Sequence, residues 1–362
     1  MKILPSEMLF LKHNSDIKWA STLPSPLYTE DEYFKKEMTE IFDGHWNLLG
    51  STRALAEKGG YFTAQAGLEN FLIVNGAGDP KDPSGFVNVC RHRAGPVALG
   101  SGHARAFQCR YHGWTYDLTG NLVGTPEFQG VEGFKKEDNP LPKISVALLG
   151  PLVFGSLSPV IPFEKFKNLE EILDPSLEPF FEKDYQVDCN WKVYVDNYLE
   201  GYHLPLVHKG LSSELDYSQY RTEVSEWYSE QMAPAKASAA LYRSEEGTSA
   251  RYFWLFPNTM LNIYQGLVQT NTVIPVSKNQ TVVKFVWYTT PEKQKQSKER
   301  IEQMMKFSDV IQEEDRVICE QVQKNLRSQT YSSGRYSVKR ENGVHHFHHL
   351  IAKCYRGPGE FR

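Results

Sequence analysis

The sequence predicts an α+β protein in two parts: an all-β domain, followed by a larger domain with an antiparallel sheet flanked by helices. Two observations lead to this prediction. From Trp46 to Leu157, short apolar runs alternate with clusters of glycine, proline and aspartate, a pattern typical of strands and turns. After Pro162, stretches with helical spacing alternate with long stretches of strand-like alternation, which indicates mixed helix and sheet.

Length and composition support this division and exclude several classes of protein. A chain of 362 residues is long enough for about two domains. The net charge of −4 does not suggest a nucleic-acid partner. The longest mostly apolar stretch, residues 146–154, is far shorter than the ~20 residues that span a bilayer. Because the first 14 residues also lack the apolar core of a secretory signal, we expect a cytoplasmic protein without a membrane partner.

Three segments follow from the pattern along the chain. Residues 1–42 are predicted to be an N-terminal arm that packs on the larger domain. Its helix, Thr29 to Phe42, would be opened by a capping box at Thr29–Glu32. Residues 43–160 form the all-β domain, with a hairpin turn at Asp117–Gly120.

The third segment, residues 161–362, contains the mixed elements. In it we expect a helix over Asn190–His203 that Pro205 ends, antiparallel strands over 251–275 and 281–290, and a helix over Lys298–Leu326. The histidine-rich run Val344–His349 is interpreted as a packed or surface strand, with pocket lining as the alternative. Three further cysteines, Cys189, Cys319 and Cys354, are expected to be small buried apolar side chains.

Two cysteines and two histidines form the first candidate site. Cys90-Arg-His92 is followed after sixteen residues by Cys109-Arg-Tyr-His112. The five cysteines of the chain are too few and too scattered for a disulfide framework, so metal binding in a reducing compartment is favoured. Such ligands bind zinc, or they hold a 2Fe-2S cluster with the cysteines on one iron and the histidines on the other. Because each motif supplies one cysteine and one histidine, we favour the cluster.

A second candidate site lies in the larger domain. His203 and His208 are five residues apart, and on a helix Asp196 and Glu200 would share one face with His203. Two histidines and a carboxylate hold Fe(II) with positions left open for O2. The carboxylate must come from elsewhere in the sequence. In the helix over Lys298–Leu326, Asp315 falls on an apolar face, where a buried acid needs a partner. A bound metal would be such a partner, which makes Asp315 a candidate third ligand, with Glu314 as the alternative.

These motifs resemble those of the Rieske non-haem iron oxygenases, and the resemblance covers nearly the whole chain. Cys90-Arg-His92-Arg-Ala-Gly and Cys109-Arg-Tyr-His112-Gly-Trp-Thr-Tyr-Asp resemble the Rieske motif, and residues 197–208 resemble the pattern Asn-Tyr-x-Glu-x-Tyr-His-x4-His. The resemblance implies that residues 43–160 are a Rieske domain and residues 161–362 a catalytic domain. It implies the following ligands: Cys90, His92, Cys109 and His112 for a 2Fe-2S cluster, and His203, His208 and Asp315 for mononuclear Fe(II).

The same resemblance implies a mechanism and partners. Glu200 matches the acidic residue that links a Rieske histidine of a neighbouring subunit to the iron site, where a carboxylate between two metal-bound imidazoles would fix their N–H groups. The implied enzyme is an O2-dependent monooxygenase or dioxygenase that acts as a homotrimer. Since the chain shows no nicotinamide or flavin fingerprint, electrons would come from a separate reductase or ferredoxin. The alternatives are a Rieske electron-transfer protein without oxygenation and a zinc protein.

The substrate is predicted from two further segments. Residues 256–264 and 322–348 resemble the choline monooxygenase and glycine betaine monooxygenase branch, although the residues after Cys90 and His112 depart from the plant choline enzymes. This favours a quaternary ammonium or N-methyl substrate, with aromatic-ring hydroxylation as the alternative. A trimethylammonium group prefers an aromatic cage, and the candidate walls are Tyr194, Tyr202, Trp254, Phe256 and Tyr264.

Overall fold

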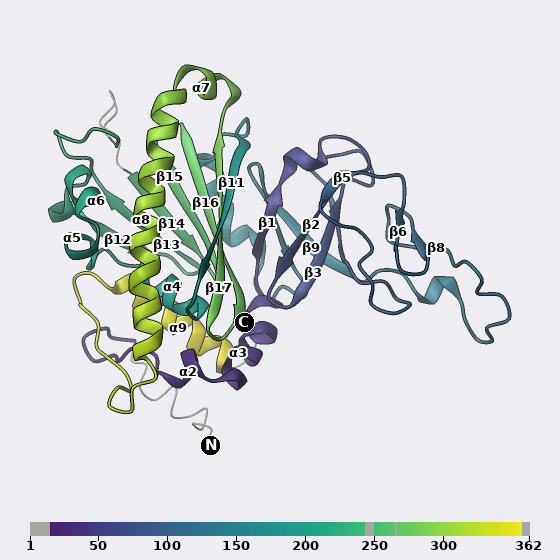
Figure 1. The fold of residues 1–362 in the computed structure, drawn as a ribbon, viewed down its shortest axis with the longest axis horizontal. Helices are drawn as coiled ribbons and strands as arrows, with labels where there is room; N and C mark the ends of the chain where they lie inside the picture. The colour runs from purple at the N-terminus through teal and green to yellow at the C-terminus, as the bar shows by residue number, and fades with distance from the viewer. Residues whose placement is uncertain (1–14, 243–249, 265, 357–362) are drawn as a thin grey trace. The chain divides into compact units, whose positions relative to one another are not determined.

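The computed structural model describes residues 15–242, 250–264 and 266–356 (Figure 1). Within these limits the chain divides into two compact units. One is Phe42–Pro175, and the other combines Met1–Ile41 with Ser176–Arg362. No helix in the described ranges has the length and apolar character needed to cross a bilayer.

The unit Phe42–Pro175 is built on antiparallel strands, as the sequence predicts. Its large sheet has the order β1-β10-β9-β4-β3-β2-β5, and a small sheet has the order β6-β7-β8. The strands are β1 (Asn47–Ser51), β2 (Gly60–Ala66), β3 (Glu69–Val74), β4 (Ser84–Val87), β5 (Ser101–His103), β6 (Phe107–Gln108), β7 (Thr115–Tyr116), β8 (Leu122–Gly124), β9 (Lys143–Leu149) and β10 (Leu152–Ser156). Short 3₁₀ turns lie at Thr52–Leu55, Lys136–Asp138 and Phe163–Ile172.

The predicted hairpin turn at Asp117–Gly120 is confirmed. It joins the antiparallel strands β7 and β8, and the Gly120 N–H donates to the Asp117 carbonyl at 3.1 Å. Gly120 has a φ of +83°, in the left-handed region that favours glycine, and a Cβ here would lie 2.5 Å from the Phe86 ring. The apolar cluster that contains Phe86 also contains Cys90 and Cys109, so this turn borders the first candidate site.

The other unit is a seven-stranded antiparallel sheet with helices against it (Figure 1). The strand order is β11-β17-β16-β15-β14-β13-β12. The strands are β11 (Glu178–Val187), β12 (Arg221–Val224), β13 (Tyr228–Ala233), β14 (Ala250–Leu255), β15 (Thr259–Tyr264), β16 (Leu267–Ser277) and β17 (Gln280–Thr289). The helices are α2 (Pro26–Thr29), α3 (Asp31–Glu37), α4 (Trp191–Tyr198), α5 (Leu204–Val207), α6 (Lys209–Glu214), α7 (Pro291–Gln296), α8 (Lys298–Asn325) and α9 (Asn342–Arg356). The antiparallel sheet and the long helix α8 confirm the predicted fold class.

A buried ion pair ties the N-terminal helix α3 to α4. The Lys192 ammonium lies 2.6 Å from one Glu37 carboxylate oxygen and 2.7 Å from the other, and both side chains are fully buried. The Trp191 indole also donates to this carboxylate at 2.8 Å. Because an isolated buried charge is costly, loss of either partner would disrupt the position of α4. This helix carries residues of the second candidate site.

The predicted helix over Thr29–Phe42 is wrong in its start. Thr29 ends α2 instead of capping a helix, and its hydroxyl donates to the Ser25 carbonyl at 3.2 Å. The next helix, α3, begins at Asp31 without a side-chain cap and continues as a π-helical turn over Met38–Phe42. Pro26 fits the first turn of α2 because that turn has no use for its missing N–H.

The predicted helix over Asn190–His203 begins as expected and ends too late. Asn190 caps α4 by accepting a hydrogen bond from the Lys192 N–H, but α4 ends at Tyr198. The Glu200 carboxylate then accepts hydrogen bonds from the backbone N–H groups of Tyr202 and His203, which competes with helix continuation. Pro205 does not end a helix: it lies in the first turn of α5.

The interpretation of Val344–His349 as a strand is also wrong, because this segment lies inside α9. Its histidines therefore follow helical spacing, and His348 is buried while His345 and His349 are partly exposed. The three cysteines outside the candidate site, Cys189, Cys319 and Cys354, are buried as predicted.

Candidate metal centres and substrate pocket

The four residues of the first candidate site lie together at one end of the unit Phe42–Pro175. Cys90 follows β4 and Cys109 follows β6, and both are buried. The rings of His92 and His112 are 4.6 Å apart between centroids, and His92 stacks on Trp114. The two loops approach closely at Gly95, because a Cβ at this position would come within 3.0 Å of the Cys109 sulfur.

The electrostatics of these groups suit a metal cluster. Burial, followed by the neighbouring Cys90, raises the pKa of the Cys109 thiol, although backbone N–H groups offset part of this. Burial, followed by the neighbouring His92 ring and the Arg93 guanidinium, lowers the pKa of His112, which favours the neutral ring that binds a metal. Among the described residues, His92 Nδ1 is buried without a hydrogen-bond partner. A bound cation would stabilise both thiolates and use this nitrogen, so the donor set fits a 2Fe-2S cluster.

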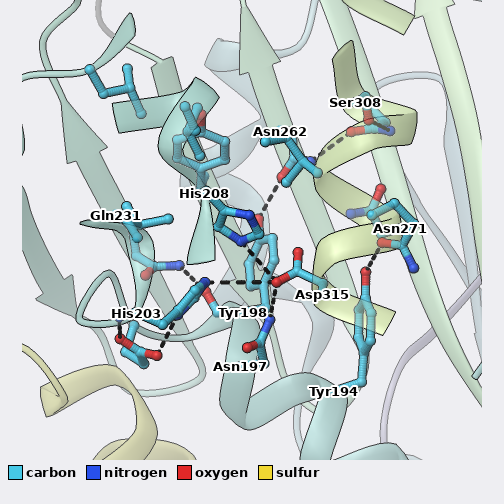
Figure 2. Close-up of a pocket in the computed structure, with 18 of the residues that line it drawn as sticks. Tyr194, Asn197, Tyr198, His203, His208, Gln231, Asn262, Asn271, Ser308 and Asp315 are labelled. Atoms are coloured by element: carbon cyan, nitrogen blue, oxygen red, sulfur yellow. Dashed lines mark hydrogen bonds and ion pairs between the residues drawn. The ribbon is translucent and has the colours of Figure 1, made fainter. Parts of the chain in front are cut away.

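The second candidate site joins two segments that are far apart in sequence. His203 precedes α5, His208 lies between α5 and α6, and Asp315 lies on α8. Figure 2 shows the three side chains pointing toward one another. Asp315 Oδ1 lies 2.9 Å from His208 Nε2 and 3.7 Å from His203 Nε2. One ligand atom from each residue falls within 4.8 Å of the other two. Two imidazoles and one carboxylate at such distances fit an Fe(II) site with open positions.

Each histidine of this group has a carboxylate on its far nitrogen. Glu200 Oε1 lies 2.5 Å from His203 Nδ1, and Glu314 Oε2 lies 2.7 Å from His208 Nδ1. These contacts favour the tautomer with the proton on Nδ1, which leaves Nε2 free to bind a metal. Burial alone lowers the pKa of His208, but Asp315 and Glu314 outweigh burial and raise it.

A hydrogen bond also fixes the orientation of the Asp315 carboxylate. The Asn197 side chain donates a hydrogen bond of 2.6 Å to Asp315 Oδ1, and this places α4 against α8 at the site. The structure separates Asp315 from its alternative, Glu314: only Asp315 belongs to the described group of candidate ligands, whereas Glu314 lies behind His208. The sequence missed the Glu314 contact because the register of α8 against His208 is a tertiary feature.

A pocket opens beside the His203–His208–Asp315 group (Figure 2). Its volume is about 110 Å³. Apart from this group and Glu200, its lining consists of tyrosines, amides, apolar side chains and Ser308. It includes Tyr194, Tyr198, Tyr220, Tyr242, Tyr252, Tyr264, Asn262, Gln269 and Asn271. Burial raises the pKa of all six tyrosines well above the usual range, so their hydroxyls stay neutral.

Only part of the aromatic cage predicted from the sequence lines this pocket. Tyr194 and Tyr264 do so. Trp254 and Phe256 are fully buried core residues, and Tyr202 is 58% exposed. The remaining aromatic walls come from side chains that the sequence analysis did not select, above all Tyr242 and Tyr252.

Strand register explains why these walls were missed. Tyr252 on β14 pairs with Asn262 on β15, and Asn262 pairs with Gln269 on β16. The three residues form one row across the sheet, and the Asn262 amide donates to Gln269 at 2.7 Å. Buried amides inside apolar strands are a sequence signal that could have identified this row, because buried polar groups need partners.

Comparison with known proteins now identifies the class. The model of the Rieske [2Fe-2S] domain matches residues 45–135, and the model of the ring hydroxylating alpha subunit (catalytic domain) matches residues 173–357. The chain therefore belongs to the Rieske non-haem iron oxygenases, oxidoreductases that carry a 2Fe-2S cluster and a mononuclear iron. As the oxygenase alpha subunit of a multicomponent system, it receives electrons and acts on a small molecule.

The relatives include plant and bacterial enzymes. Chloroplastic choline monooxygenase of Arabidopsis thaliana is 33% identical over 92% of this chain and 82% of its own length. The carnitine monooxygenase oxygenase subunit of Escherichia coli K12 is 30% identical over 93% of this chain and 94% of its own. A quaternary ammonium Rieske monooxygenase superposes with a TM-score of 0.84 at 26% identity, over 98% of this chain and 99% of that one. Naphthalene 1,2-dioxygenase, at 17% identity and a TM-score of 0.77, shares the fold.

Proposed function

We propose that this chain is the oxygenase component that oxidises a quaternary ammonium or N-methyl compound at the His203–His208–Asp315 site. The observation that carries the proposal is the pocket itself, which has the three candidate iron ligands at one end and tyrosines around the rest. The names of the choline and carnitine monooxygenases that are similar to this chain support the same substrate class.

The ligand assignments form part of the proposal. Cys90, His92, Cys109 and His112 hold the 2Fe-2S cluster, and His203, His208 and Asp315 hold Fe(II). When bound, the cluster supplies electrons singly and the iron supplies O2 activation. Glu200 and Glu314 fix the orientation of the two histidines, and Asn197 fixes that of Asp315. The pocket then holds the substrate beside these ligands.

The pocket favours a cation. Its charged lining side chains outside the histidines are carboxylates, Glu200 and Asp315, and neutral tyrosine rings attract cations through their faces. The rings of Tyr242 and Tyr264 are 5.2 Å apart, and those of Tyr252 and Tyr264 are 6.2 Å apart. The described lining contains no lysine or arginine that could pair with a substrate carboxylate, so we expect cations with a neutral second end, such as choline, to be better substrates than zwitterions.

A substrate panel with coupled O2 uptake tests this proposal. It compares choline, glycine betaine, carnitine, smaller N-methylamines and simple aromatic acids, each with product analysis. We expect product from ammonium compounds, with choline above the zwitterions. Product from the aromatic compounds alone would contradict the proposed substrate class and favour ring hydroxylation. O2 uptake without any product would contradict oxygenation and favour a Rieske electron-transfer protein.

The ligand roles are tested by Asp315→Ala. This variant should keep the Rieske spectrum and lose both mononuclear iron and turnover. Normal activity would remove Asp315 from the iron site.

The assembly is proposed on the same basis. We infer a homotrimer in which Glu200 connects a neighbour's Rieske histidine to the iron site, with electrons from a separate reductase or ferredoxin. A structure of a quaternary ammonium Rieske monooxygenase similar to this chain is described in terms of inter-subunit electron transfer. Native mass tests the trimer, and a fully active monomer would contradict it. The cytoplasmic location expected from the sequence stays a prediction.

A further inference from the structure

Hydroxylation needs protons as well as electrons. Oxidation of a C–H bond to an alcohol with O2 takes up two electrons and two protons and releases one water. The substrate pocket is a poor entry for these protons. Burial raises the pKa of the tyrosines that line it, so these hydroxyls are weak proton donors. A bound substrate also occupies the space. A second route to the iron ligands would therefore serve the reaction.

A second cavity of about 210 Å³ lies against a neighbouring side of α4. Val193 and Asp196 of this helix line the cavity, whereas Tyr194 and Tyr198 line the substrate pocket. Asn197 and Glu200 line both spaces, so at these two positions a single layer of side chains separates them. Both residues also contact the candidate iron ligands, through Asp315 and His203.

A hydrogen-bonded chain of ionisable side chains lies at this cavity, and three of its members, Tyr28, Asp196 and His348, line it. The Tyr336 hydroxyl lies 2.6 Å from His348 Nδ1, and His348 Nε2 lies 2.8 Å from Asp196 Oδ1. The Tyr28 hydroxyl donates to Asp196 Oδ2 at 2.7 Å. His348 is only 1% exposed although it lines the cavity, so its ring is held in place by these contacts. Histidine is the side chain best suited to pass protons near neutral pH.

Glu341 lines the same cavity and is partly exposed, so the cavity joins a solvent-accessible carboxylate to the side of the chain where His348 and Asp196 lie. Burial raises the pKa of Glu341; the backbone N–H of Ser337 opposes this, and the charges of Glu200 and Asp196 add to it. The titratable and charged groups around the cavity come from five elements. They are Lys192, Asp196 and Glu200 on and after α4, Tyr331, Tyr336 and Glu341 before α9, His348 on α9, Tyr28 on α2, and Cys319 on α8.

We propose that this cavity is the proton entry of the oxygenase site. Glu341 and the His348–Asp196 pair take protons from solvent and pass them toward the wall formed by Asn197 and Glu200. Each step moves one proton between two oxygen or nitrogen atoms and transfers no electron. The reaction's two electrons still arrive by the cluster. The inference rests on the proposed oxygenation, because only that reaction consumes the protons.

The same contacts also hold α2, α4 and α9 together, so the experiment must separate proton delivery from a structural role. It compares Glu341→Gln and His348→Gln with Glu299→Gln, which neutralises an exposed carboxylate on α8 away from the cavity. The readouts are kcat and KM, the solvent deuterium isotope effect on kcat, product formed per O2, and the iron and cluster content. The substrate is whichever compound the unchanged enzyme oxidises, so a failed substrate prediction changes the compound and not the comparison.

We expect Glu341→Gln and His348→Gln to lower kcat about tenfold or more, with KM within about twofold. The solvent isotope effect should rise and product per O2 should fall, while metal content stays normal. Small weak acids in the buffer should restore part of the kcat of Glu341→Gln. Values equal to those of Glu299→Gln overturn the proposal, as does a fall in kcat that follows iron loss with an unchanged isotope effect. If His348→Gln does not fold, Glu341→Gln still tests the proposal, because Glu341 is partly exposed.

Discussion

Glu314 Oε2 lies 2.7 Å from Nδ1 of His208, while Nε2 of the same ring lies 2.9 Å from Asp315 Oδ1. Adjacent residues of α8 therefore hold the two nitrogens of one imidazole. A carboxylate on the nitrogen that does not bind metal makes the ring a stronger ligand and fixes its tautomer.

Glu314→Gln should weaken iron binding about 10–100-fold, because loss of this kind of carboxylate typically costs that much in metal affinity. Iron titration of the metal-free protein measures the effect. The Rieske spectrum should not change. Glu313→Gln is the matched control, since Glu313 is one position away and pairs with Arg316 instead. Equal iron affinity in both variants would show that the Glu314 contact does not support His208.

Glu200→Gln should separate electron delivery from metal binding. Glutamine keeps the shape of the side chain and its acceptor oxygen, but it removes the charge that faces His203 Nδ1 at 2.5 Å. With added Fe(II) keeping the iron site saturated, we expect the cluster to be retained and its reduced form to be reoxidised about 10–100-fold more slowly on mixing with O2 and substrate. Stopped-flow absorbance follows this step directly. An unchanged reoxidation rate would remove Glu200 from the electron route.

Tyr264→Leu should weaken binding of a quaternary ammonium substrate. Tyr264 lies between Tyr242 and Tyr252, and a cation–π contact at a desolvated site contributes about 2 kcal/mol, which corresponds to roughly 30-fold in KM. Tyr264→Phe keeps the ring face and should retain most of the affinity. A neutral tert-butyl analogue provides the substrate control. If Tyr264→Leu weakens the analogue and the cation equally, the ring contributes shape and not charge recognition.

His346 should lower the free energy of unfolding at acid pH for the unit that contains Ser176–Arg362. Burial, followed by the nearby His349, lowers the pKa of His346 to about 4. Below the ordinary value of about 6.5, the unfolded chain therefore binds a proton that the folded chain does not, so stability falls as the pH drops from about 6.5 toward 4. At pH 5 this loss is at most about 2 kcal/mol.

His346→Gln should reduce the difference in thermal unfolding midpoint between pH 7 and pH 5. His103→Gln, at an exposed position of the other unit, is the control and should leave that difference unchanged. A His346→Gln protein with the same acid sensitivity as the unchanged protein would contradict the predicted role of this buried ring.

Local patterns in the sequence were sufficient for the fold class, the antiparallel strands, α8 and the candidate ligands. The ligands were found because Cys90-x-His92, Cys109-x-x-His112 and His203-x4-His208 are short-range motifs, and Asp315 because it interrupts an apolar helical face. Local patterns failed where side chains compete with the backbone. Glu200 accepts backbone N–H groups and ends the helix that periodicity extends to His203. The histidine-rich run 344–349 was interpreted as a strand because its local pattern does not distinguish a strand from a helix. Its packing in α9 decides between them.

The sequence by itself thus indicated the candidate metal ligands through residue type and short spacing, and the class of enzyme through the resemblance of these motifs to those of the Rieske oxygenases. Only the tertiary structure decided what surrounds the ligands. Glu314 reaches His208 through the register of α8, and Tyr252, Asn262 and Gln269 form one row through the register of β14, β15 and β16. Asp196 and His348, 152 positions apart, meet beside a second cavity. Such contacts depend on how distant elements pack, and a one-dimensional pattern carries little information about that.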